Sequence, residues 1–183
     1  NGCVSIINTV IDVIDVNIAQ NDTNICFGES VSLSLENGYS IGSFGPAGGL
    51  IFYDKGYESD GWRYLESAPD NWDNGSEPIT TWGCSGTMIN GADGYVIGTG
   101  KQNTLDIISG CAGVNAANIC LAANINGYDD WYLPSIDELY EMYKNLKLNG
   151  LGGFETHYYW SSTEYSAIGA LFIEFGLPNI QYG

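Results

Sequence analysis

The sequence predicts an α+β fold with short strands and many loops. Three observations support it: 25 of the 183 residues are glycine, helical patterns occupy residues 103–148, and strand patterns lie on both sides of them. Glycine adopts the positive φ angles of tight turns, so about twice its usual frequency of ~7% indicates many turns. With 44% hydrophobic and 13% aromatic residues, the chain has enough apolar side chains to bury a core.

The first 36 residues are predicted to form a separate β segment. Residues 4–18 are rich in Val and Ile, and residues 25–35 alternate apolar and polar side chains, as half-buried strands do. Gly and Pro are then concentrated in residues 37–49, which indicates a boundary. We therefore expect a β-strand segment over 1–36 and a second domain over 37–183.

The second domain alternates strand and helix patterns. The predicted strands cover 50–56, 61–69, 158–162 and 170–175, and the predicted helices cover 103–109, 114–123 and 135–148. The last helix has the clearest signal, because Ser135 follows Pro134 and Glu138 comes three residues later, which is a capping box. Its apolar stripe consists of Leu139, Met142, Tyr143 and Leu146.

Charge excludes one large class of partners. Five Lys and Arg face 22 Asp and Glu, a formal charge of −17. Nucleic acids and other polyanions need a basic surface that displaces their counterions, so they are not expected as ligands. No apolar run approaches the ~18 residues of a membrane-spanning helix, so no membrane span is expected either.

The five cysteines favour an oxidising compartment. They stand at positions 3, 26, 84, 111 and 120 and match neither a zinc-site spacing nor a CxxC redox motif. We predict a structural disulfide that joins Cys111 and Cys120 across a short loop, with Cys84 either free or paired with an N-terminal cysteine. We also expect the sequence to be part of a longer exported chain.

Two short stretches resemble bacterial Ig-like repeats. NGC at 1–3 and ICFGESVSLS at 25–34 look like the late and early cysteine strands of successive repeats in large surface proteins of Bacteroidetes. The resemblance implies an extracellular location and neighbouring repeats of the same chain as partners. Pairing of Cys3 with Cys26 is compatible with it but is not implied by it.

Residues from about 40 to 183 resemble the C-terminal domain of the Legionella collagen-like adhesin. The motifs in order are FGPAGGLIFYDKG, GWRYLESAP, the WG pair at 82–83, IGTGKQNT, NGYDDWYLPSIDELYEMYKNL and YYWSSTEY. The resemblance implies a C-type-lectin-like fold, related to that of the formylglycine-generating enzyme, with a twisted antiparallel sheet and two flanking helices. It also implies a binding head that can form trimers.

Two departures from that family matter. The named adhesin binds sulfated glycosaminoglycans, which need Lys and Arg, so this ligand is not transferred to a chain of charge −17. Family members also end in a further strand, whereas this chain stops at IQYG, so we expect the last strand to be missing.

Two acidic groups are candidate ligand or metal sites. Asp129 and Asp130 could bind Ca²⁺, which prefers carboxylate and carbonyl oxygens, but the favoured interpretation is that they end a turn before the helix. In the long loop, Trp72 is the candidate platform for a sugar ring. The acidic residues proposed to accompany it are Asp70, Asp73, Glu77 and Asp93. Trp131 and Trp160 are expected in the core.

No catalytic motif is recognisable. Residues 98–102 lack the spacing of a phosphate-binding loop. The single histidine, His157, stands just before a predicted strand, where an ordinary surface residue is expected rather than a general base. We therefore predict a non-enzymatic cell-surface adhesion module that recognises a glycan or a protein. The alternative is a structural subunit or tip domain of a surface filament or gliding-motility assembly.

Overall fold

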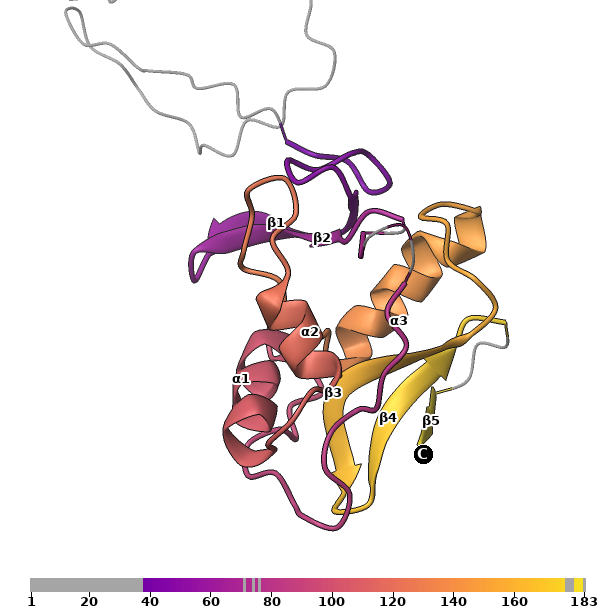
Figure 1. Cartoon of the computed structure of the whole chain (residues 1–183). Helices are drawn as coiled ribbons and strands as arrows, with labels where there is room; N and C mark the ends of the chain where they lie inside the picture. Colours follow the sequence, from indigo (N-terminus) through magenta and orange to yellow (C-terminus); the bar gives the residue numbers. More distant parts are fainter. Residues whose placement is uncertain (1–37, 71, 74, 76, 177–179, 183) are drawn as a thin grey trace, which may run out of the picture. The chain divides into compact units, whose positions relative to one another are not determined.

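The computed structural model describes residues 38–70, 72, 73, 75, 77–176 and 180–182. The predicted Ig-like segment, with Cys3 and Cys26, lies outside these residues. The described elements are β1 (Leu50–Ser59), β2 (Trp62–Ser67), α1 (Gly100–Gly110), α2 (Ala116–Ala122), α3 (Ile136–Asn145), the 3-10 helix η1 (Lys147–Asn149), β3 (Tyr158–Ser166), β4 (Gly169–Glu174) and β5 (Ile180–Tyr182). The mixed α+β class is therefore confirmed (Figure 1).

Strands β1 and β2 form the predicted antiparallel hairpin. Leu50 pairs with Ser67 and Asp54 with Tyr64. Asp60 and Gly61 make the turn with φ angles of 55° and 79°, in the left-handed region that such turns require. The hairpin forms locally because its alternating strands are joined by turn residues that accept these angles.

The second sheet contains β3, β4 and β5 in that order, all antiparallel. The described residues contain two separate antiparallel sheets, where the resemblance implied one, and the three helices that the sequence pattern predicted. Helix α3 contacts β1 on one side and β3 and β4 on the other, so it stands between the two sheets (Figure 1). Near the end of the chain, Ile180–Tyr182 form β5, a strand that the sequence pattern did not predict.

Helix α3 forms as predicted because its first turn is capped. The side chain of Ser135 accepts a hydrogen bond from the backbone amide of Glu138, and the Glu138 carboxylate accepts one from the amide of Ser135. Asp137 and Glu138 also place negative charge at the positive end of the helix dipole. Leu139 and Tyr143 from the predicted stripe are buried, so this face holds the helix against its neighbours.

The core consists of three clusters, and α3 contributes to two of them. Against β4, Ile136, Leu139 and Tyr143 pack on Leu171, Ile173 and Phe175. Towards the hairpin, Leu146 packs on Phe52 and Leu65. The third cluster joins α1, α2 and β4 through residues that include Trp82, Ile89, Ile107, Leu133 and Ala170. The indole nitrogen of Trp82 donates to the carbonyl oxygen of Ser161 at 2.7 Å.

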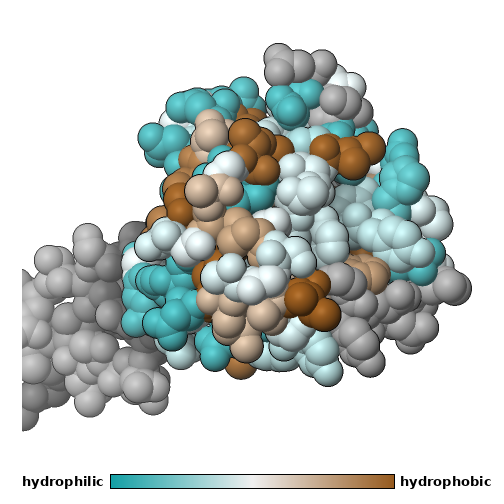
Figure 2. Space-filling model, turned by 60° about the horizontal axis from the view of Figure 1, so that its bottom comes forward, coloured by the Kyte–Doolittle hydropathy of each residue, from teal (hydrophilic) through white to brown (hydrophobic). Residues whose placement is uncertain are grey.

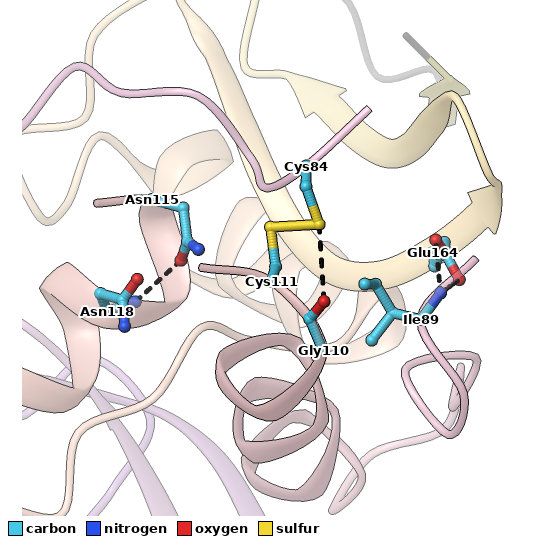
Figure 3. The surroundings of a disulfide bond; sticks show 7 residues. All are labelled: Cys84, Ile89, Gly110, Cys111, Asn115, Asn118 and Glu164. Atoms are coloured by element: carbon cyan, nitrogen blue, oxygen red, sulfur yellow. Dashed lines mark hydrogen bonds between the residues drawn. A yellow bond between two sulfur atoms is a disulfide. The ribbon is translucent and has the colours of Figure 1, made fainter. Parts of the chain in front are cut away.

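One disulfide joins Cys84 to Cys111, with a Cα–Cα distance of 5.5 Å (Figure 3). The predicted Cys111–Cys120 pair is therefore wrong, and among the described cysteines Cys120 is free. Cys111 ends α1 and faces the segment at Gly83 and Cys84. That segment is anchored by the burial of Trp82, so Cys84 is held within reach of Cys111. Cys120 lies on the C-terminal turn of α2.

All five basic residues of the chain lie within helices or strands. They are Lys55 in β1, Arg63 in β2, Lys101 in α1, Lys144 in α3 and Lys147 in η1. Several are held by the protein: Lys55 donates to the carbonyl of Ser59 at 2.7 Å, and Lys147 donates to the carbonyl of Phe154. Positive charge is thus scarce on this domain and already partnered in part.

Candidate functional site

A pocket of about 410 Å³ lies beside the β1–β2 hairpin. Its walls come from the hairpin, the loop before β1, Trp72, the end of α2, the segment between α2 and α3, and Met142 of α3. These pieces span more than one hundred residues of sequence, so the pocket exists only once the domain has folded. Its volume is in the usual range for a small-molecule site.

Aromatic side chains dominate the lining. They are Tyr39, Phe52, Trp62, Tyr64, Trp72, Tyr128, Trp131 and Tyr132. Such rings present flat apolar faces, on which sugar rings stack and over which cations bind. The pocket therefore has the composition of a binding site rather than of a packing defect in an aliphatic core.

Strand β2 supplies one wall, since all of its residues line the pocket. Trp62, Tyr64 and Glu66 are alternate residues and share one face of the strand. The ammonium nitrogen of Lys55 lies over the Trp62 ring, 3.8 Å from the ring centroid. The guanidinium carbon of Arg63 lies 4.7 Å from the centroid of the Tyr64 ring. Neighbouring cations thus pack on these two rings.

The loop before β1 is fixed as a second wall by polar contacts. The Glu66 carboxylate accepts hydrogen bonds from the amides of Ala47, at 3.2 Å, and Gly49, at 2.7 Å. The Asn126 side chain donates to the carbonyl of Ala47 at 2.7 Å. A Cβ atom on Gly49 would collide with the carbonyl oxygen of Ser67, so glycine is required for this close approach.

The third wall is the segment that leads into α3. Trp131 donates its indole N–H to the carbonyl of Tyr128 at 3.0 Å. The hydroxyl of Tyr132 donates to Oε1 of Glu138 at 3.3 Å. Burial, together with the nearby charge of Glu138, raises the pKa of Tyr132, and burial raises the pKa of Glu138. Tyr132 is thus a neutral phenol, tied to the capped end of α3.

Two polar groups of the pocket have no partner. Asp130 is exposed, and no basic side chain of the described residues forms an ion pair with it. The hydroxyl of Tyr64 is buried without a hydrogen-bond partner in the described part of the chain. Of these two groups, the exposed Asp130 carboxylate is the one accessible to a ligand.

Cys120 also lines the pocket, but its thiol is a weak nucleophile. Burial raises the pKa of its thiol to about 12. At neutral pH the group is a protonated thiol, whereas thiolate is the nucleophilic form. We assign Cys120 a packing role in the wall.

The structure gathers only part of the predicted binding group into the pocket. Trp72 lines it, and Asp73 lies next to Trp72 in an adjoining shallow hollow. Asp70 instead lies beside Gly153, and Glu77 accepts a hydrogen bond from the Tyr159 hydroxyl at 2.8 Å. Asp93 acts on Glu164, whose pKa it raises. These five residues therefore do not form a single site.

The predicted calcium ligands Asp129 and Asp130 are both exposed. Within the described residues, no group of three or more His, Cys, Asp or Glu side chains is placed to hold a metal ion. Asp130 lines the aromatic pocket, whereas Asp129 does not. The two adjacent carboxylates therefore have different surroundings.

Most of the pocket's aromatic residues were missed by sequence reasoning. Trp131 was expected in the core, but it is half-buried and lines the pocket. Trp160 does pack against the first core cluster, as expected. The available signal was the presence of two large rings, Trp62 and Tyr64, at alternate positions of β2, because such positions share one face of a strand.

Comparison of the chain with protein-family models, with curated proteins and with solved structures finds no match in any of the three. The resemblance of residues 40–183 to the collagen-like adhesin domain therefore stays a prediction. Among the described residues, no helix is long and apolar enough to cross a lipid bilayer.

Proposed function

We propose that this chain is a non-enzymatic binding module of a bacterial cell surface, and that its ligand enters the aromatic pocket. The pocket carries the proposal: eight aromatic side chains converge from distant parts of the chain on about 410 Å³. Its wall residues are held by hydrogen bonds before any ligand arrives, which lowers the entropy cost of binding.

The surrounding chemistry supports binding rather than catalysis. The Glu66 carboxylate is occupied by two loop amides, Tyr132 is a neutral phenol and Cys120 is a protonated thiol. The Cys84–Cys111 disulfide is in keeping with an oxidising, extracellular location. The same proposal includes the C-type-lectin-like fold and assembly into trimers. It also includes a surface glycan or protein as the partner, and a Ca²⁺ ion bound at Asp129 and Asp130.

The test is binding of the purified chain to a panel of glycans and surface proteins, with calcium and with chelator. Trp131→Ala should lower binding at least tenfold, because it removes a pocket wall. Tyr140→Ala is the matched control, since Tyr140 is an exposed aromatic residue that does not line the pocket. Equal binding by both variants would contradict the pocket as the ligand site. Loss of binding in chelator would support the calcium site.

A structural subunit of a surface assembly is the second candidate. Met88 and Ile168 are 65% and 76% exposed, and their segments are joined by a hydrogen bond from the amide of Gly86 to the carbonyl of Ala167 at 2.6 Å. Figure 2 brings this end of the domain forward and shows hydrophobic residues in several patches between hydrophilic ones. Concentration-dependent sedimentation that Ile168→Asp abolishes would favour assembly through this face.

A further inference from the structure

We infer that the aromatic pocket binds a compact organic cation, an alkylated or quaternary ammonium group. This inference rests on the proposed function and names the ligand class of the same pocket. It follows from three features of the lining: its aromatic rings, its charge, and the hydrogen bonds that its polar groups already make within the protein.

The rings supply the first part of the argument. A cation over an aromatic face is attracted by the ring's quadrupole, most strongly by Trp. Three of the pocket's eight aromatic residues are Trp62, Trp72 and Trp131. The domain already uses this interaction next to the pocket, where Lys55 lies over Trp62 and Arg63 over Tyr64.

Charge supplies the second part. Asp130 and Glu66 bring two carboxylates to the lining, and Arg63 is its only basic residue among those described. The Arg63 guanidinium is itself neutralised by Asp54, through contacts of 2.9 Å and 3.2 Å. Lys55, which lies over Trp62, pairs with Asp60 at 3.8 Å. The surroundings of the pocket therefore keep an excess of negative charge inside a chain of charge −17, and that field attracts cations and repels anions.

The occupied polar groups decide between a cation and a neutral sugar. A sugar presents many hydroxyl groups that need hydrogen-bond partners once they are buried. In this lining Glu66, Trp131 and Tyr132 already bond to the protein itself. An alkylated ammonium group asks for few hydrogen bonds, and it matches aromatic walls with an unpaired carboxylate at Asp130.

The experiment is calorimetric titration of the full chain with choline, with its uncharged isostere 3,3-dimethyl-1-butanol, and with glucose and galactose. We expect choline to bind about tenfold or more tightly than the isostere, since only the charge differs. Asp130→Asn should weaken choline binding about fivefold. Asp106→Asn is the matched control, because it removes the same charge from a residue of α1 that lies outside the lining, and it should leave binding almost unchanged.

Equal affinity for choline and the isostere would overturn the inference, and so would equal effects of the two Asp variants. Sugar binding that Trp131→Ala abolishes, without choline binding, would refute the cation and leave the proposed function standing. Failure of every probe, together with surface binding that is insensitive to Trp131→Ala, would refute both. Unchanged urea unfolding midpoints confirm that each variant is folded.

Discussion

The backbone amide of Ile89 donates to both carboxylate oxygens of Glu164, at 3.0 Å and 2.9 Å, across 75 residues of sequence (Figure 3). Glu164 is only 5% exposed, on β3. The bond joins the long loop before α1 to the second sheet, next to the disulfide. Burial raises the pKa of Glu164, the Ile89 amide opposes that rise, and the charge of Asp93 adds to it.

Glu164 therefore gives the domain a definite pH dependence. Its folded pKa lies above the ordinary value of 4.5, so between the two values the folded state binds more protons than the unfolded state. The free energy of unfolding should then fall as pH rises through this window. Asp93→Asn removes a charge that acts on Glu164, so it should reduce this fall. It should add about 0.3 kcal/mol to the free energy of unfolding at pH 7 and nothing at pH 3. Urea unfolding at both pH values measures this; a gain of equal size at pH 3 would contradict it.

Replacing Glu138 by Gln should destabilise the domain by about 1–3 kcal/mol. The carboxylate accepts from the amides of Gly98, at 2.8 Å, and Ser135, at 2.7 Å. Glutamine offers one acceptor oxygen, so one of these amides loses its partner. Thermal unfolding gives the change, with the half-buried Glu141→Gln on the same helix as control. An effect no larger than that of Glu141→Gln would show that the capping box contributes little.

Removal of the disulfide should cost roughly 3.5 kcal/mol, from the chain entropy of a closed loop of this length. Cys84 and Cys111 are 27 residues apart. The double variant Cys84→Ser and Cys111→Ser should therefore unfold at lower urea concentration than Cys120→Ala. Peptide mapping without reductant should recover a fragment that links Cys84 to Cys111. A fragment that links Cys111 to Cys120 would contradict the structure.

The Asp54–Arg63 pair should stabilise the hairpin by about 1 kcal/mol at neutral pH. The hydrogen bonds from Arg63 hold the pKa of Asp54 below the ordinary value of 3.8. This stabilisation is present above that value and is lost as pH falls through the lower folded pKa. Asp54→Asn should therefore lower stability at pH 7 and make little difference near pH 2. Lys144→Ala, which removes an exposed pair with Glu141, is the control.

Local signals determined which parts of the fold could be predicted. The capping box at Ser135 and the alternation on both sides of the Asp60–Gly61 turn act within a few residues, so α3 and the hairpin were expected almost where they occur. The cysteine pairing could not be predicted because it depends on the path of residues 82–84 over the core. Strand β5 has three residues, too few to show an alternating pattern.

The pocket shows a second limit of sequence reasoning. Trp131 and Trp160 both lie in apolar, aromatic stretches and carry the same local signal. Trp160 packs against the core, whereas Trp131 lines the pocket. Only the position of the neighbouring hairpin distinguishes them, and that position is set by Leu146 of the α3–η1 region against Phe52 and Leu65. Trp72 was expected outside the core because it lies in a polar loop, and it is among the residues that line the pocket.

The placement of the five basic residues has a consequence for proteolysis. Proteases that cut after Lys or Arg bind an extended, detached stretch of backbone, and here every such residue lies in a helix or a strand. Cleavage therefore has to wait for local or global unfolding. The folded domain therefore offers trypsin-like enzymes almost no substrate, and the rate at which they digest it measures how often it opens.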